Sequence, residues 1–274
     1  MFDLSSFEWI RLHPWLFAII LNSVLWLFAA LLPKKLLTPA GYVHAWILGV
    51  LVWGCLGWQG YMIVMFYFLF GSAVTRIGKA QKEAAGIAEK RDGARGPENV
   101  WGSALTGTLC AIALALYAQV QGVPSHPLPA VPPLVIILLQ LGYVASFATK
   151  LADTTASEVG KAYGKRTFLI TSLQPVPAGT EGAVSLEGTL AGLVGAVAIA
   201  LLGYGLEMID SIGMLWCIVA AFIATNIESL IGATLQEQLD WMTNEVVNFI
   251  NTAIGAILAI LLGWGWAWLL IMNG

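Results

Sequence analysis

The chain has 274 residues, of which 58% are hydrophobic and 11% are charged, and its formal net charge is −3. Soluble domains carry about 25% charged residues, so this composition excludes an ordinary soluble domain. The small negative charge argues against a nucleic-acid partner. High apolar content excludes a disordered chain, and three cysteines are too few for a disulfide scaffold. We therefore expect an all-α membrane helix bundle that forms one transmembrane domain over residues 1–274.

The apolar runs predict about eight membrane spans, because each span needs about 20 mainly apolar residues. The second and third runs are short and nearly fused, so residues 42–74 form either one long tilted helix or a broken pair of helices. In chain order the predicted spans are Pro14–Leu32, Tyr42–Gly57, Gly60–Val74, Val100–Val120, Pro133–Ala148, Leu186–Gly203, Ile212–Ile231 and Val247–Met272.

The basic residues predict the orientation of these spans. Twelve of the 13 Lys and Arg residues fall in or beside alternate connections, and Arg11 is the exception. Loops rich in Lys and Arg stay on the cytosolic side of a membrane. We therefore expect the loops 75–99 and 150–185 to face the cytosol and both termini to lie outside.

A short internal similarity predicts a repeated unit. Gly71–Ala80 aligns with Asp153–Ala162 at a spacing of 82 residues, and Ser229–Gly232 repeats part of the pattern. Each copy ends a span that runs toward the basic side, which favours helical hairpin repeats inserted in parallel around a shared site. The alternative is that the Gly and Ala spacing common to helix bundles produces the match by chance.

Polar residues gather at Lys150–Arg166, at the end of the fifth predicted span. On a helix, Asp153, Ser157, Gly160 and Gly164 share one face, and a second face carries Thr154, Glu158, Lys161 and Lys165. Asp153 and Glu158 lie about 140° apart, so they have separate roles unless the helix is broken. A solvated helix end with Glu–Lys pairs is the alternative.

Two Gly-rich loops on the same side are candidates for binding phosphate. Arg91 and Arg95 lie four residues apart in the first loop, and their guanidinium groups suit phosphate oxygens; attraction of a basic loop to inner-leaflet lipid is the alternative. Residues 177–189 lead into a helix whose start favours anions, although a plain helix start explains them equally well. A P-loop motif is absent and the three histidines form no motif, which argues against a P-loop nucleotide fold or a His-liganded zinc site.

Several of these motifs together resemble the family of phytyl-phosphate kinases and transmembrane protein 19. The resemblance runs from about Ala40 to Gln236, and one position departs from it, since many members carry Asp where Glu228 stands. A weaker likeness, at Asp153–Lys165, connects the chain with CTP-using lipid enzymes. The matching segments are Gly71–Lys82, Arg91–Asn99, Asp153–Gly160, Gly179–Gly182 and Glu228–Gln236.

The resemblance implies an enzyme that transfers the γ-phosphate of a nucleoside triphosphate, with CTP favoured, to phytyl monophosphate. The product, phytyl diphosphate, would serve tocopherol or phylloquinone synthesis. The implied cofactor is Mg²⁺, and the implied location is a cyanobacterial plasma or thylakoid membrane or a plastid envelope. The partners are then a prenyl phosphate, a nucleotide, the lipid bilayer and, in a homo-oligomer, a second copy of the chain.

The same resemblance implies roles for individual residues. The implied catalytic residues are Asp153, Glu158 and Arg76, and the implied metal ligands are Asp153, Glu158 and Glu228. The implied phosphate-binding residues are Lys79, Lys82, Arg91, Arg95, Asn99, Lys161, Lys165, Glu181, Ser229 and Gln236. Two other functions compete with this one: another CTP-using lipid enzyme, either an alcohol kinase or a cytidylyltransferase, and a membrane transporter.

Overall fold

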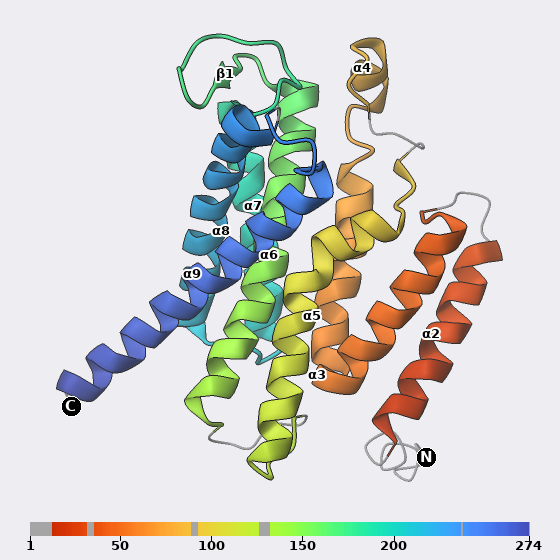
Figure 1. The fold of residues 1–274 in the computed structure, drawn as a ribbon, viewed down its shortest axis with the longest axis vertical. Helices are drawn as coiled ribbons and strands as arrows, with labels where there is room; N and C mark the ends of the chain where they lie inside the picture. The colour runs from red at the N-terminus through yellow and green to blue at the C-terminus, as the bar shows by residue number, and fades with distance from the viewer. Residues whose placement is uncertain (1–12, 32–35, 89–92, 126–131, 237, 274) are drawn as a thin grey trace.

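The computed structural model describes residues 13–31, 36–88, 93–125, 132–236 and 238–273. It is an all-α polytopic bundle, as expected from the composition (Figure 1). The helices, in chain order, are α2 (Pro14–Leu31), α3 (Pro39–Val74), α4 (Lys79–Ala84), α5 (Pro97–Val120), α6 (Leu134–Tyr163), α7 (Leu186–Gly205), α8 (Ser211–Ile231) and α9 (Asn244–Asn273). A π-helical turn, Gly232–Gln236, follows α8, and the strands β1 (Phe168–Leu169) and β2 (Ala183–Val184) form an antiparallel pair.

The predicted spans fall on these helices. Within the described part of the chain, six helices (α3 and α5 to α9) are long and apolar enough to cross a membrane, and α2 has a shorter apolar stretch. All eight predicted runs lie within or largely overlap α2, α3 and α5 to α9, and two of them share α3. The polytopic membrane architecture is therefore confirmed.

The helix α3 is folded back on itself at Gly57. This glycine has φ 67° and ψ −158°, a backbone conformation that is essentially restricted to glycine. A straight helix of 36 residues would be about 54 Å long. Instead, Arg95 contacts both ends of α3: its carbonyl accepts a bond from Thr38 N at 3.0 Å, and its Nη1 donates to the Tyr67 hydroxyl at 3.0 Å. Residues 42–74 are therefore a broken pair, whose arms run down and back up in Figure 1.

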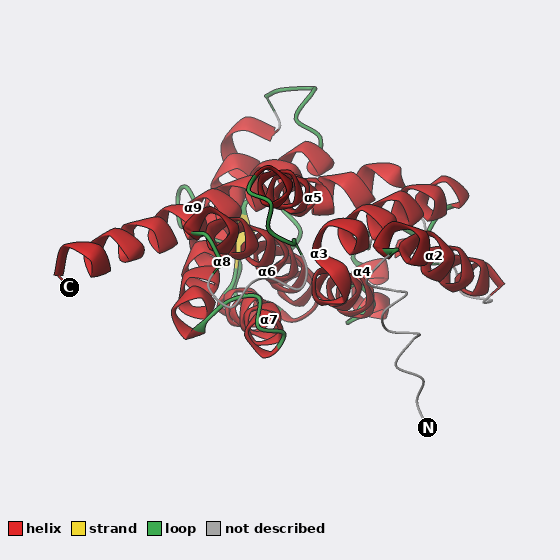
Figure 2. Cartoon of the chain, turned by 90° about the horizontal axis from the view of Figure 1, so that it is seen from below, coloured by secondary structure: helices red, strands yellow, loops and turns green. Residues whose placement is uncertain are grey.

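The helix α6 is the centre of the bundle. It contacts α3, α5, α7, α8 and α9, and it lies between them when the molecule is seen end-on (Figure 2). Its residues 141–153 are buried without interruption. The buried Tyr143 hydroxyl donates to the Gly60 carbonyl at 2.7 Å, which fixes α6 beside the fold in α3.

Glycines on α7 allow it to pack closely against α6. A side chain at Gly188 would lie 2.7 Å from the Ala156 carbonyl oxygen, and one at Gly195 would lie 2.9 Å from that of Leu151. On α6, Gly160 faces Ser185 and Gly188 of α7. The small residues that the sequence placed on one face of α6 thus admit a neighbouring helix backbone.

The polar connections lie at one end of the bundle. The segments before α3, between α3 and α5, between α6 and α7 and between α8 and α9 share the upper end in Figure 1. The start of α2 and the end of α9 lie toward the lower end, where the C-terminal half of α9 extends away from the other helices. This alternation matches the distribution of Lys and Arg in the sequence.

The copies of the predicted repeat have different local conformations. In the first copy the helix ends at Val74 and Gly78 is left-handed, with φ 60°. In the second copy α6 continues as a helix through Tyr163. The third copy runs into the π-helical turn at Gly232. The hairpin repeat therefore remains a prediction from the sequence.

Candidate functional site

A cavity of about 700 Å³ opens at the polar end of the bundle. Its wall is formed by α3, α5, α6, α7, α8 and α9 together with the loops that precede α5 and α7. The charged residues that line it are Arg95, Lys150, Asp153, Glu158, Lys161, Glu181, Glu228 and Glu245, joined by polar residues that include Tyr67, Asn99, Ser103, Thr154, Ser157, Thr225, Asn226, Ser229 and Asn248. The cavity thus collects polar groups from segments far apart in the sequence.

The loop between α6 and α7 forms one wall of the cavity. Its β1–β2 pair is short, and Gly182, with φ 73°, is packed against α8 so closely that a side chain there would lie 2.6 Å from the Ser229 carbonyl oxygen. Gly179, with φ 88°, packs against Ile87 of the loop before α5. These two glycines let the loop lie tightly between the two sides of the opening.

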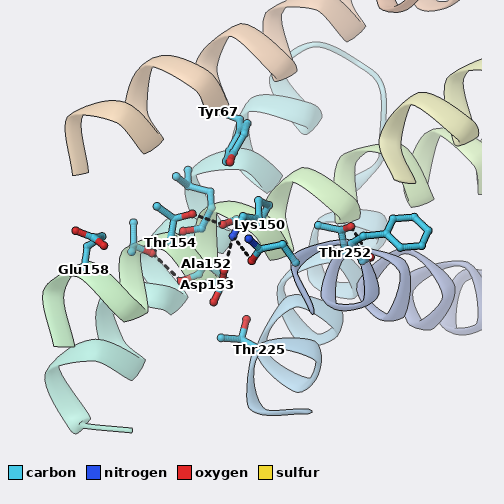
Figure 3. Close-up of polar contacts among 12 residues, drawn as sticks. Tyr67, Lys150, Ala152, Asp153, Thr154, Glu158, Thr225 and Thr252 are labelled. Carbon is cyan, nitrogen blue, oxygen red and sulfur yellow. Dashed lines mark hydrogen bonds and ion pairs between the residues drawn. The ribbon is translucent and has the colours of Figure 1, made fainter. Parts of the chain in front are cut away.

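Lys150 and Asp153 form a buried ion pair in the cavity wall. Lys150 Nζ lies 2.5 Å from Asp153 Oδ2 and donates to Asn248 Oδ1 on α9 at 2.7 Å (Figure 3). Lys150 and Asp153 are 6% and 8% exposed, respectively. A charge is costly to bury unless it is paired, and here Lys150 contacts both Asp153 and Asn248.

Glu228 lies near this ion pair, across the cavity on α8. Its carboxylate interacts electrostatically with Asp153 and Lys150, and also with Glu181 and Lys161. Two carboxylates that face each other in a buried place repel unless a cation or a proton lies between them. Asp153 and Glu228 therefore form an acidic pair that is suited to a cation.

Glu158 has a different environment, one turn and a half farther along α6. It forms a buried ion pair with Lys82 of α4, whose ammonium group also donates to the Thr75 carbonyl at 2.8 Å. Lys161 Nζ lies 3.8 Å from the other carboxylate oxygen of Glu158. The unbroken helix α6 keeps Asp153 and Glu158 on different faces, as the sequence indicated, and Glu158 fastens the α4 segment to the bundle.

Arg95 lies on the α3 side of the cavity. Its guanidinium carbon is 5.2 Å from the centre of the Tyr67 ring, a cation–π arrangement, and its Nη1 bonds the Tyr67 hydroxyl. Close by, Asn99 accepts a bond from Gly96 N at 3.0 Å and donates to Glu245 of α9 at 3.2 Å. The start of α5 is thus joined to both α3 and α9.

Other predicted site residues lie outside the cavity wall. Arg76, Lys79 and Lys165 are exposed and do not line it. Lys79 pairs with Glu83 at 3.6 Å. Gln236 ends the π-helical turn with its buried Oε1 unpaired, and Arg91 lies outside the described residues. By contrast, the lining includes Arg95, Asn99, Asp153, Glu158, Lys161, Glu181, Glu228 and Ser229.

The sequence analysis did not assign several residues of the lining to the site. Tyr67 and Lys150 lay in or beside predicted spans, and the whole contribution of α9, Glu245 and Asn248, was overlooked. A signal was present: Asn244, Asn248, Asn251, Thr252 and Gly255 recur at helical spacing in an otherwise apolar run. Such a polar stripe in a membrane span marks a functional face.

The three predicted metal ligands do not form one cluster. Among the residues that the structure describes, no group of three or more His, Cys, Asp or Glu side chains lies close enough to hold a metal ion. Asp153 and Glu228 both line the cavity and interact electrostatically, whereas Glu158 pairs with Lys82.

Comparison with known proteins identifies the family. The model of the family described as "Integral membrane protein DUF92" matches residues 22–256. An uncharacterized membrane protein of Synechocystis sp. is 63% identical over 90% of this chain and 90% of its own length. Protein VTE6, chloroplastic, of Arabidopsis thaliana is 42% identical over 90% of this chain and 72% of its own length.

The similarity extends to a more distant relative. An uncharacterized membrane protein of Methanocaldococcus jannaschii is 32% identical over 85% of this chain and 89% of its own length. No solved structure matches the chain. The matched region contains α3 to α8 and therefore most of the cavity wall. The chain belongs to the DUF92 family of integral membrane proteins.

Proposed function

We propose that the protein is a prenyl-phosphate kinase that transfers the γ-phosphate of a nucleoside triphosphate, CTP in the favoured case, to phytyl monophosphate. The observation that carries the proposal is the polar cavity around Asp153, Lys150 and Glu228, at one end of an apolar bundle. Ionisable groups in membrane spans are costly and are kept for function. Support also comes from the motif resemblance to phytyl-phosphate kinases and from the similarity to a chloroplastic plant protein.

The charges of the cavity suit polyanionic substrates only together with a divalent cation. Among the residues that the structure describes, five carboxylates line the cavity, against three cationic side chains. Two of those cations, Lys150 and Lys161, lie beside Asp153 and Glu158. A nucleotide and a prenyl phosphate would add further negative charge, so a cation is needed to bring them together.

The residues fit Mg²⁺ in the way that such sites usually hold it. Mg²⁺ in phosphoryl-transfer sites is commonly bound by one or two carboxylates and by substrate phosphates, and Asp153 and Glu228 supply a facing pair. When bound, the ion would neutralise negative charge on the phosphates and the charge that develops during transfer.

The transfer itself requires positioning more than covalent chemistry. An oxygen of the acceptor phosphate forms a bond to the γ-phosphorus, the bond from that phosphorus to the bridging β–γ oxygen breaks, and a nucleoside diphosphate leaves. A phosphate monoester has a second pKa near 6, so it is largely a dianion at neutral pH and attacks without a general base. We expect Lys150 and Arg95, which both line the cavity, to hold the phosphates.

The proposed function also requires an orientation of the protein in its membrane. Lys and Arg are concentrated on the side of the cavity, and such loops face the cytosol or its topological equivalent. The nucleotide would then reach the cavity from the cytosolic side, with both termini on the opposite side. A cyanobacterial or plastid membrane agrees with the similarity to a Synechocystis protein and to a chloroplastic protein.

An end-point assay tests the proposal. Purified protein in detergent is given phytyl phosphate, Mg²⁺ and, in turn, each of the four nucleoside triphosphates labelled at the γ-phosphate. We expect labelled phytyl diphosphate with at least one donor. Release of pyrophosphate would instead identify a cytidylyltransferase, and an absence of labelled lipid from folded protein with every donor would refute the kinase.

A matched pair of variants tests the site. Asp153→Asn keeps the shape of the side chain but removes its charge, so we expect turnover to fall by about 100-fold or more, the range for losing a charge that acts in the transition state. Asp240→Asn makes the same change at an exposed position outside the cavity and should leave turnover unchanged. Near-normal turnover of Asp153→Asn would show that its carboxylate holds neither metal nor phosphate.

A further inference from the structure

The polar cavity is the first of three hollows that adjoin one another. A narrow second hollow of about 40 Å³ shares Tyr67, Arg95, Asn99 and Ser103 with it. A third hollow, a groove of about 590 Å³, shares Trp26 and Leu37 with the second. Together they extend from the polar cavity, past α5 and α3, to the outer surface between α2 and the first arm of α3.

The three hollows change in chemical character along this direction. Of the described residues, eight charged ones lie in the walls of the first hollow. The second hollow is lined mainly by apolar side chains of α2, α3 and α5, with Arg95 at the end nearest the polar cavity. The described lining of the groove contains Trp26, Leu27, Val43 and Trp46 and includes no charged side chain. This polarity matches that of a prenyl phosphate, which has a dianionic head on an apolar tail.

We propose that these hollows form the path of the acceptor's isoprenoid tail, with the phosphate of the acceptor at Arg95. The proposal rests on the proposed function and adds to it the side from which the lipid arrives. The acceptor would move laterally out of the bilayer between α2 and the first arm of α3. Its head would pass the Arg95–Tyr67 pair into the polar cavity, while most of its tail stayed in the groove.

Arg95 lies at the boundary between the polar cavity and the second hollow, and its position there is fixed. Its main chain is fixed, since its N donates to the Leu36 carbonyl and its carbonyl accepts from Thr38 N, both at 3.0 Å. Its guanidinium group lies over the Tyr67 ring and lines both hollows. A guanidinium group binds phosphate with two parallel hydrogen bonds, and the remaining apolar wall excludes water from the start of the tail.

The helix α2 is the part of the groove's wall that can move. It packs mainly against α3 and lies at the edge of the bundle (Figure 2). The rim of the groove is held by two hydrogen bonds, from the Tyr42 hydroxyl to the Ala29 carbonyl at 3.2 Å and from Trp46 Nε1 to Ser23 Oγ at 3.0 Å. The second hollow has a volume of only about 40 Å³, so a tail would enter by displacing α2 slightly.

Filling the second hollow tests the path. Ala104 on α5 is 2% exposed and lines only this hollow of the three, so Ala104→Leu should block it. Ala111, 1% exposed on the same helix, lies outside all three hollows, and Ala111→Leu is the matched control. We expect Ala104→Leu to raise KM for phytyl phosphate by about tenfold or more, as a misfit of a few methylenes does.

A short acceptor distinguishes an effect on binding of the tail from an effect on binding of the phosphate head. Isopentenyl phosphate has a single isoprene unit and would not extend into the groove, so the ratio of its kcat/KM to that of phytyl phosphate should rise in Ala104→Leu and stay constant in Ala111→Leu. Equal losses for both acceptors in Ala104→Leu, or equal losses in both variants, would overturn the tail path. Each variant is first checked for a monodisperse, folded population in detergent.

A binding measurement keeps this proposal distinct from the kinase. A phytyl phosphate analogue with a photoreactive diazirine on its tail is irradiated with the wild-type protein in phospholipid vesicles, and the labelled peptides are mapped. We expect labelling of α2 and the first arm of α3 that excess phytyl phosphate prevents. Labelling that is not competed would show ordinary bilayer lipid in the groove and would overturn the path. Competed labelling without turnover would refute the kinase alone.

Discussion

The ion pair between Lys82 and Glu158 should contribute strongly to stability, because both side chains are buried. They are 2% and 4% exposed, respectively, and Lys82 is the buried residue by which α4 attaches to α6. In Lys82→Met, Glu158 would keep Lys161, which is partly exposed and 3.8 Å away, but it would lose its buried partner. Removing one member of a buried pair costs about 3–5 kcal/mol, since the remaining charge stays in an apolar environment.

Thermal unfolding in detergent measures this effect. For a chain of this size, 1 kcal/mol shifts Tm by about 2–4 °C, so we expect Lys82→Met to lower Tm by about 6–20 °C. Lys79→Met is the matched control three residues earlier: its pair with Glu83 is about half exposed, and such a pair contributes about 0.3–0.5 kcal/mol. The double variant Lys82→Met, Glu158→Leu removes both charges and should recover most of the loss. Similar Tm values for Lys82→Met and Lys79→Met would refute the reasoning.

Two glycines give further predictions, for which Gly205→Ala is a control because open space surrounds that position. Gly57→Ala should lower the free energy of unfolding by about 1–3 kcal/mol, since its φ of 67° and ψ of −158° strain any other residue, and a thermal unfolding curve checks this. An unchanged Tm would show that α3 is not folded back at this residue. Gly71→Ala should raise KM for the acceptor, because a side chain there would lie 2.8 Å from Arg95 Nη2 and would move the guanidinium group; steady-state kinetics with phytyl phosphate measures it. If Gly71→Ala and Gly205→Ala had the same KM for the acceptor, Arg95 would not take part in acceptor binding.

The fold was largely predictable because its main determinant is local. Long apolar runs specify membrane helices, and the alternation of Lys and Arg specifies their direction. The fold in α3 was left open because the run from Tyr42 to Val74 is interrupted only by glycines and a few polar residues, and hydropathy does not distinguish a helical glycine from Gly57. The contact of Arg95 with both ends of α3 is information that only the three-dimensional structure contains.

The candidate site was predictable in part, since charge at membrane depth draws attention to a residue but does not reveal its partner. Asp153 and Glu228 were found in this way. Lys82 was assigned to phosphate from the family resemblance, and the structure shows its ammonium group buried against Glu158. Lys150 was not assigned to the site, although Asp153 and Asn248 hold it at the centre of the cavity. The packing of α4, α6 and α9 decides which charged side chains pair. Local sequence patterns do not reveal how these helices pack.

The order of the charged groups along the cavity explains how two anionic substrates would meet there. Arg95 bonds Tyr67, Tyr67 interacts electrostatically with Lys150, and Lys150 pairs with Asp153. Asp153 in turn faces Glu228, which interacts with Lys161 and Glu181 on the far side.

Under the proposed function, the acceptor would lie at the Arg95 end and the nucleotide at the Lys161 end. The acidic pair of Asp153 and Glu228 would then stand between the reacting phosphates, where a divalent cation is most effective. In-line transfer requires the attacking and leaving oxygens on opposite sides of the phosphorus. Substrates that arrive from opposite ends, one from the bilayer and one from the aqueous phase, meet this requirement without a large conformational change.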